Sequence, residues 1–112
     1  MRVDIRLRSL DESTSLRDHA RRRVRFHLDR FDRELSAVTV RIGDVNGPKG
    51  GNDKRCQITA HGPRVGSASV ADQHGDAYAA LESAIERMAR TVGREIERDR
   101  SREHGGSSSR SA

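Results

Sequence analysis

The chain has little of what builds a large core or a disulfide framework. Its 112 residues include no tryptophan, one tyrosine and two phenylalanines, so the core must be thin and largely aliphatic. A single cysteine, Cys56, excludes an intramolecular disulfide and suits a reducing compartment. No apolar run has the length of a signal peptide or of a membrane span. We therefore expect one small cytoplasmic domain that does not enter a membrane.

The sequence also lacks any grouping that predicts a catalytic or metal centre. Cys56 alternates with apolar residues and is expected in the core, with no third group to orient a Cys/His pair. His27 falls on the apolar side of a predicted helix, where a hydrogen-bonded boundary histidine is expected rather than a ligand. No histidine has a partner at metal-ligand spacing, which holds for His19, His27, His61, His74 and His104. We expect no enzyme, no cofactor, no metal and no small-molecule substrate.

Basic charge, by contrast, is abundant. The net charge is +5, the estimated pI is 10.6, and 20 of the 22 basic residues are arginine. Such a surface favours polyanions, and guanidinium groups suit phosphate, although a GC-rich genome would also explain the arginine bias. The segment at residues 47–50 matches the GxxG of KH domains, but it lies between predicted strands rather than helices. We instead expect a hairpin loop whose lysines, Lys49 and Lys54, contact phosphate.

Hydrophobic periodicity predicts four strands and two helices. Period-two alternation marks strands near residues 3–7, 37–42, 56–60 and 65–71, the last built of small side chains. The first helix is expected over residues 15–32, with Ser13 as its N-cap. Its buried stripe consists of Leu16, Ala20, Val24, Leu28 and Phe31. Phe26 lies outside that stripe and is expected either to pack at the sheet edge or to stack on a base.

The second helix, over residues 76–98, has two opposed faces. An apolar stripe recurs every three or four residues and comprises Tyr78, Leu81, Ala84, Ile85, Met88, Val92 and Ile96. At about 100° per residue, a row of arginines falls nearly opposite that stripe: Arg87, Arg90, Arg94 and Arg98. We expect Glu86 to pair with Arg90 and so to offset part of the repulsion within the row. A solvated face and an anion-binding face both fit this pattern.

The order of elements is β-α-β-β-β-α, which predicts an α+β fold with two helices on one face of a four-stranded sheet. We expect the folded domain to cover residues 1–98. Residues 99–112 are rich in serine and glycine and are expected to form a disordered tail.

With these elements in place, the chain resembles the ribosome hibernation family, the group of hibernation-promoting factor and ribosome-associated inhibitor A. The resemblance covers residues 1–98 and rests on several segments. These are the apolar-alternating first strand, Leu16-Arg17, the loop at residues 44–56, the helix opening Asp76-Ala77-Tyr78-Ala79-Ala80-Leu81, and the arginine row.

The resemblance implies a double-stranded-RNA-binding-like domain that binds the small (30S) ribosomal subunit and its rRNA. Such a domain blocks the channel for tRNA and mRNA and inhibits translation in bacteria under stress or in stationary phase. The long forms carry a second, dimerising domain, so this chain is expected to be a monomer off the ribosome. The resemblance and the basic pattern together give the expected RNA-binding residues, Arg21, Arg22, Arg23, Arg25, Arg87, Arg90, Arg94 and Arg98.

Matching position by position, Arg23 falls on a basic position of the family's first helix, and Arg87, Arg90 and Arg94 fall on or near those of the second. Phe26 and Asp29 replace two further basic positions, which Arg22 and Arg25 can take over by a shift of one residue. Two alternatives stay open. One is a free-standing double-stranded-RNA-binding module, and the other is a regulator that acts through a protein partner.

Overall fold

The structure, a computed structural model, describes residues 1–8, 14–45 and 53–111, with side chains described up to residue 102. The elements follow the expected β-α-β-β-β-α order. They are β1 (Arg2–Arg8), α1 (Thr14–Leu28), a short 3-10 helix η1 (Asp29–Phe31), β2 (Ala37–Asp44), β3 (Lys54–Gly62), β4 (Gly66–His74) and α2 (Ala77–Ser111). Ser13 and residues 47–50, for which a cap and a loop were predicted, lie outside the described residues.

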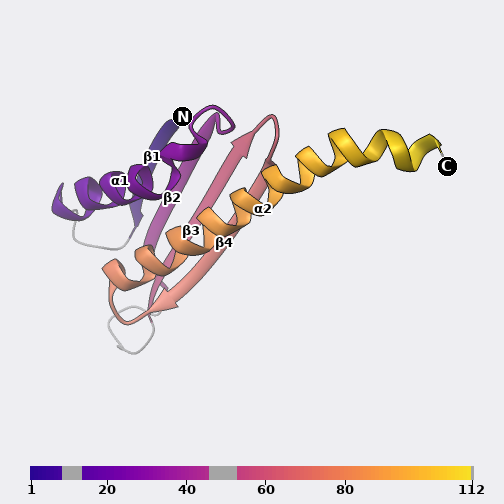
Figure 1. Cartoon of the computed structure of the whole chain (residues 1–112). Coiled ribbons are helices and arrows are strands. Elements are labelled where there is room, and N and C mark those ends of the chain that lie inside the picture. Colours follow the sequence, from indigo (N-terminus) through magenta and orange to yellow (C-terminus); the bar gives the residue numbers. More distant parts are fainter. Residues whose placement is uncertain (9–13, 46–52, 112) are drawn as a thin grey trace.

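One mixed sheet carries the whole fold, with its strands in the order β1-β2-β3-β4. β1 runs parallel to β2, so α1 crosses over between them, whereas β2, β3 and β4 form an antiparallel meander. Both helices lie on the same side of the sheet, and the C-terminal part of α2 extends beyond it (Figure 1). The predicted α+β architecture is confirmed.

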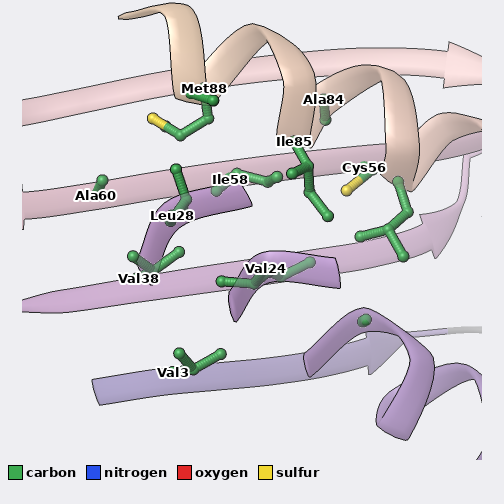
Figure 2. Close-up of a cluster of buried hydrophobic side chains, with 14 of the residues drawn as sticks. Val3, Val24, Leu28, Val38, Cys56, Ile58, Ala60, Ala84, Ile85 and Met88 are labelled. Atoms are coloured by element: carbon green, nitrogen blue, oxygen red, sulfur yellow. The ribbon is translucent and has the colours of Figure 1, made fainter. Parts of the chain in front are cut away.

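The core fills the space between the helices and one face of the sheet (Figure 2). Alternate residues of β2 and β3 are fully buried there, and they meet Leu28 from α1 and Ile85 and Met88 from α2. Aliphatic side chains predominate because the chain has so few aromatic residues. Within the described part of the chain, no helix is both long enough and apolar enough to cross a bilayer.

Two local features fix the ends of elements. Asp76 caps α2, because its Oδ2 accepts a hydrogen bond from the backbone N–H of Ala79 at 3.2 Å. At the end of β3, a Cβ on Gly62 would collide with the backbone carbonyl of Glu34. Glycine at this position therefore lets β3 approach the turn before β2, where the N–H of Ser36 donates to the carbonyl of His61 at 2.7 Å.

Some boundaries differ from the sequence-based expectation. The first helix ends at Leu28 and tightens into η1, and β4 runs on to His74. Tyr78 was placed in the buried stripe but is 40% exposed, with its ring edge-on to His19 at 4.9 Å between centroids. It stands in the first turn of α2, just before the fully buried Ala80 and Leu81.

At the C-terminus α2 continues as a helix to Ser111, beyond the helix end expected at residue 98, and the disorder expected of residues 99–112 stays a prediction. Ion pairs one turn apart support the segment just past the core. Arg98 contacts Glu95 at 2.9 Å, and Arg102 contacts Asp99 at 3.8 Å. Asp99 also lies 3.5 Å from Arg64, which precedes β4. The proposed domain limit at residue 98 stays a prediction.

Candidate nucleic-acid interface

The arginine row of α2 faces away from the sheet. Arg87, Arg90, Arg94 and Arg98 are all exposed, whereas Ile85, Met88 and Val92 on the same helix are buried. The two-faced helix predicted from the sequence is therefore confirmed. Because the apolar stripe already packs on the core, nothing else in the fold requires a basic row at this position.

The row divides into paired and unpaired members. Arg87 lies 3.0 Å from Asp72 of β4 and also donates to the carbonyl of Ala71 at 3.5 Å, so it is tied to the sheet edge. Arg98 pairs with Glu95. Arg90 and Arg94 make no ion pair with any residue that the structure describes, so the expected Glu86–Arg90 pair is not formed. The centre of the row is where an anion meets uncompensated charge.

On α1, the basic residues differ in whether their guanidinium groups contact β1, pair with a carboxylate or face solvent. Arg21 donates to the carbonyl of Val3 at 2.9 Å and so braces the helix against β1. Arg25 lies 3.4 Å from Asp29 one turn later. Arg22 is exposed and forms no ion pair within the described residues. With Arg90 and Arg94 of α2 it makes up what we call the unpaired helix arginines. Both helices lie on the same side of the sheet (Figure 1).

Arg23 does not face solvent in the same way, because it joins the two helices. Its Nε and Nη2 donate to the two carboxylate oxygens of Glu82 in α2, each at 2.9 Å. Both side chains are about one-third exposed, so this fork-to-fork pair lies between the helices rather than on the open surface. The acidic partner of the pair is not apparent from the sequence pattern, because the two residues are 59 positions apart.

His27 completes this inter-helix cluster. Its Nε2 lies 2.9 Å from Glu82 Oε2 and 3.1 Å from Arg23 Nη2. The tautomer decides whether this nitrogen donates to the carboxylate or accepts from the guanidinium. The hydrogen bond from Arg23 is the largest cause that lowers the pKa of Glu82 from 4.5 to about 2. His27 is thus the hydrogen-bonded boundary residue that the sequence predicted.

His27, Glu82 and Glu86 also have the donor types of a metal site, with ligand atoms within 4.8 Å of one another. The arrangement does not suit a cation, because Arg23 already occupies both oxygens of Glu82 with a positive charge. We regard it as an ion-pair network that fixes α1 against α2.

Phe26 is 73% exposed, so it does not pack at the sheet edge, the first of the two roles expected from the sequence. The guanidinium of Arg23 lies 4.7 Å from the centroid of its ring, and His27 meets it edge-on. It helps to line an open hollow of about 620 Å³ with Asp18, Arg21, Arg22, Arg25 and Asp29. An exposed aromatic face among arginines is a suitable platform for an unpaired base.

Two further expectations from the sequence have clear outcomes. Cys56 is fully buried, and burial raises the pKa of its thiol to about 12, so it is a core residue and not a nucleophile. Lys54 does not reach outward to phosphate. Its Nζ lies 3.0 Å from the buried Asp53 and 3.5 Å from Asp44, which satisfies the ammonium group at the start of β3.

Comparison with solved structures finds the same fold in two other proteins. Protein Y N-terminal domain from Thermus thermophilus superposes with a TM-score of 0.67 at 23% identity, covering 84% of this chain and 98% of that one. A ribosomal subunit interface protein from Coxiella burnetii gives a TM-score of 0.71 at 13% identity, covering 84% and 96%. At these identities the likeness shows the fold alone. Comparison with curated proteins finds no match.

Family membership comes from the sequence itself. The family model described as Sigma 54 modulation protein / S30EA ribosomal protein matches residues 3–100, which include all of β1 except Arg2, the other three strands, α1, and α2 past the arginine row. This match confirms the resemblance to the ribosome hibernation family. The chain belongs to the Sigma 54 modulation protein / S30EA ribosomal protein family.

Proposed function

We propose that this protein is a ribosome hibernation factor that binds the small ribosomal subunit and its rRNA through the outward faces of α1 and α2. Bound there, it blocks the channel for tRNA and mRNA and silences translation. The observation that carries the proposal is the family match over residues 3–100 together with the unpaired helix arginines, Arg22, Arg90 and Arg94. The protein acts in the cytoplasm as a monomer and needs no catalytic group.

The eight arginines predicted from the sequence divide into three roles under this proposal. Arg22, Arg90 and Arg94 contact phosphate first, because no intramolecular partner must be displaced. Arg25, Arg87 and Arg98 are exposed but paired, so each contributes only by exchanging a carboxylate for a phosphate. Arg21 and Arg23 position the helices, because their guanidinium groups are held by Val3 and Glu82.

Occupancy alone explains inhibition. A rigid domain held by several arginine–phosphate contacts excludes other ligands of the same groove without any chemical step. Such contacts also release counterions, so the affinity falls steeply as the salt concentration rises. Sequence-specific readout is not needed, which agrees with a surface that offers few aromatic residues.

The test is co-sedimentation with purified small subunits over a salt series. Replacing Arg22, Arg90 and Arg94 together by Gln removes three unpaired charges and no core atoms, so the fold should survive. The salt slope of binding should flatten by about two to three units. A control with the same charge loss, Arg2, Arg33 and Arg100 to Gln, changes exposed residues elsewhere and should have a smaller effect.

Two results would contradict the proposal. If the folded triple variant binds with the affinity and slope of the control, the helix face is only solvated. If the wild-type protein binds a short naked RNA duplex as tightly as it binds small subunits, and does not compete with tRNA for them, a free-standing RNA-binding module is the better description. Failure of the wild-type protein to bind either would favour a protein partner.

A further inference from the structure

A second basic surface lies on the side of the sheet that faces away from the helices. Strand register places Arg6 of β1 directly beside Arg41 of β2. Two residues further along the same strands, Arg8 lies beside Gly43, and Gly43 lies beside Arg55 of β3. All four arginines are exposed, and they alternate along their strands with core residues such as Leu7, Ile42 and Cys56. We call Arg6, Arg8, Arg41 and Arg55 the sheet-face patch.

Acidic residues are almost absent from this face. Among the strand residues that the structure describes, Asp4 is the one acidic side chain that points the same way, and it lies 3.6 Å from Arg6. Asp72, by contrast, is in register with the buried Cys56 and so belongs to the helix side, where it binds Arg87. Arg8, Arg41 and Arg55 form no ion pair within the described residues. The sheet therefore segregates its charges by face.

The patch is also hollowed. The four arginines line an open depression of about 300 Å³, together with Gly43 and Gln57 among others. A Cβ on Gly43 would come within 3.2 Å of the carbonyl of Arg8, so a side chain there would crowd the depression. Neighbouring strands are about 4.8 Å apart, which brings like charges close together across the sheet. The fold tolerates repulsion at this point that a bound anion would relieve.

We infer that the sheet-face patch binds the phosphodiester backbone of a second RNA segment, on the opposite side of the domain from the helix arginines. Guanidinium forks fit phosphate oxygens, and three of the four have no competing carboxylate. Among the described residues of this face, His61 at the far end of β3 is the one aromatic ring and it does not line the depression, so the contact at the patch is to the backbone and not to stacked bases. The inference rests on the proposed function and adds that the domain is held between two RNA segments.

The decisive variant replaces Arg8, Arg41 and Arg55 by Gln, and it is compared with the Arg2, Arg33 and Arg100 control, which removes the same charge. Arg2 makes the control stringent, because it lies on the same face at the other end of β1. A second variant with Lys at positions 8, 41 and 55 keeps the charge. We expect the Gln variant to bind small subunits about tenfold or more weakly than the control and to flatten the salt slope by about two units. The Lys variant should stay near wild type.

A second measurement does not depend on ribosomes. A short RNA duplex is titrated at low salt into the full-length protein with ¹⁵N-labelled arginine, and the Nε–H signals are followed. The signals of Arg8, Arg41 and Arg55 should shift as well as those of Arg22, Arg90 and Arg94. In the Gln variant of the sheet face the first three signals are absent, which assigns them, and the signals of Arg22, Arg90 and Arg94 should still respond to the duplex.

The two proposals fail in different ways. If the folded sheet-face variant binds small subunits like its control and the three guanidinium signals do not respond to the duplex, the inference is wrong while the helix interface stands. If the sheet-face variant loses subunit binding but the duplex leaves those signals unmoved, the patch contacts an acidic protein surface and the RNA inference is wrong. If the wild-type protein does not bind subunits at all, the proposed function fails, and the duplex titration alone decides the inference.

Discussion

At the scale of single residues, Glu82 has the most consequence. Its charge accompanies the arginine row in the sequence, so its removal would be expected to strengthen RNA binding or leave it unchanged. The structure gives Glu82 another role, because it accepts two hydrogen bonds from Arg23, lies 2.9 Å from His27 and so joins α1 to α2. It is a structural residue that a binding experiment must leave in place.

Replacing Glu82 by Gln should destabilise the protein by about 1–2 kcal/mol at neutral pH, a value reduced for the partial exposure of the pair. The pKa of Glu82 is lowered from 4.5 to about 2 on folding, so the native state favours the ionised form. Its contribution is complete above its ordinary pKa and is lost as the pH falls toward about 2.

Urea unfolding over this pH range measures the effect. Wild-type stability should decline more steeply than that of the Gln variant as the pH falls from 4.5 toward 2. Glu86→Gln is the matched control, since Glu86 is exposed on the same helix, and it should change stability by no more than about 0.5 kcal/mol. Parallel pH profiles for wild type and Glu82→Gln would show that the pair contributes nothing to folding.

Phe26 gives a second prediction at this scale. Its ring is exposed, so Phe26→Ala should leave the free energy of unfolding within about 0.5 kcal/mol of wild type. If the ring stacks on a base, the same change should weaken binding to small subunits by about 1–3 kcal/mol, measured by co-sedimentation. Phe26→Trp should restore it. Equal affinity for the Ala and Trp variants would leave the ring with no part in recognition.

At the scale of elements, the apolar periodicity predicted burial correctly where a single apolar stripe of an element packs on the core. The buried residues of α1 and β2 and the two faces of α2 follow the apolar periodicity, because burial of aliphatic side chains dominates their packing. The pattern was wrong at Tyr78 because periodicity does not say how soon a helix comes over the sheet. It also could not pair Arg23 with Glu82, since contacts between helices depend on how the helices dock.

The C-terminal extension of α2 can be tested at this scale. Ile96 is the last buried apolar residue that the structure describes on this helix. Removing residues 104–112, which contain no large apolar side chain, should leave the free energy of unfolding within about 0.5 kcal/mol of wild type. Removing residues 96–112 takes Ile96 from the core and should cost about 2 kcal/mol or more. Chemical denaturation compares the two, and a large loss on the shorter deletion would show that the end of α2 packs on the domain.

At the scale of the whole molecule, the fold and the two faces of α2 follow from the sequence, but the sheet-face patch does not. Arg6, Arg8, Arg41 and Arg55 belong to three strands, and nothing in their local sequence brings them together. Their clustering needs the parallel register of β1 on β2 and the antiparallel register of β3, which the alternation of apolar residues does not set. The sequence of this chain therefore does not predict which residues from different strands form a common surface.

The parallel pairing of β1 also has a consequence for the order in which the domain assembles. β2, β3 and β4 pair with neighbours in the chain, whereas β1 pairs with β2 across the connection that contains α1, so we expect β1 to join the sheet later. Like β4, β1 is an edge strand held by one partner in the sheet, where local opening is possible. Because it carries Arg6 and Arg8, local opening of this edge would dismantle the sheet-face patch while leaving the α2 row intact. The two basic faces of the domain thus depend on different elements. The arginine row is present whenever α2 is docked, whereas the sheet-face patch is present only when β1 is paired with β2.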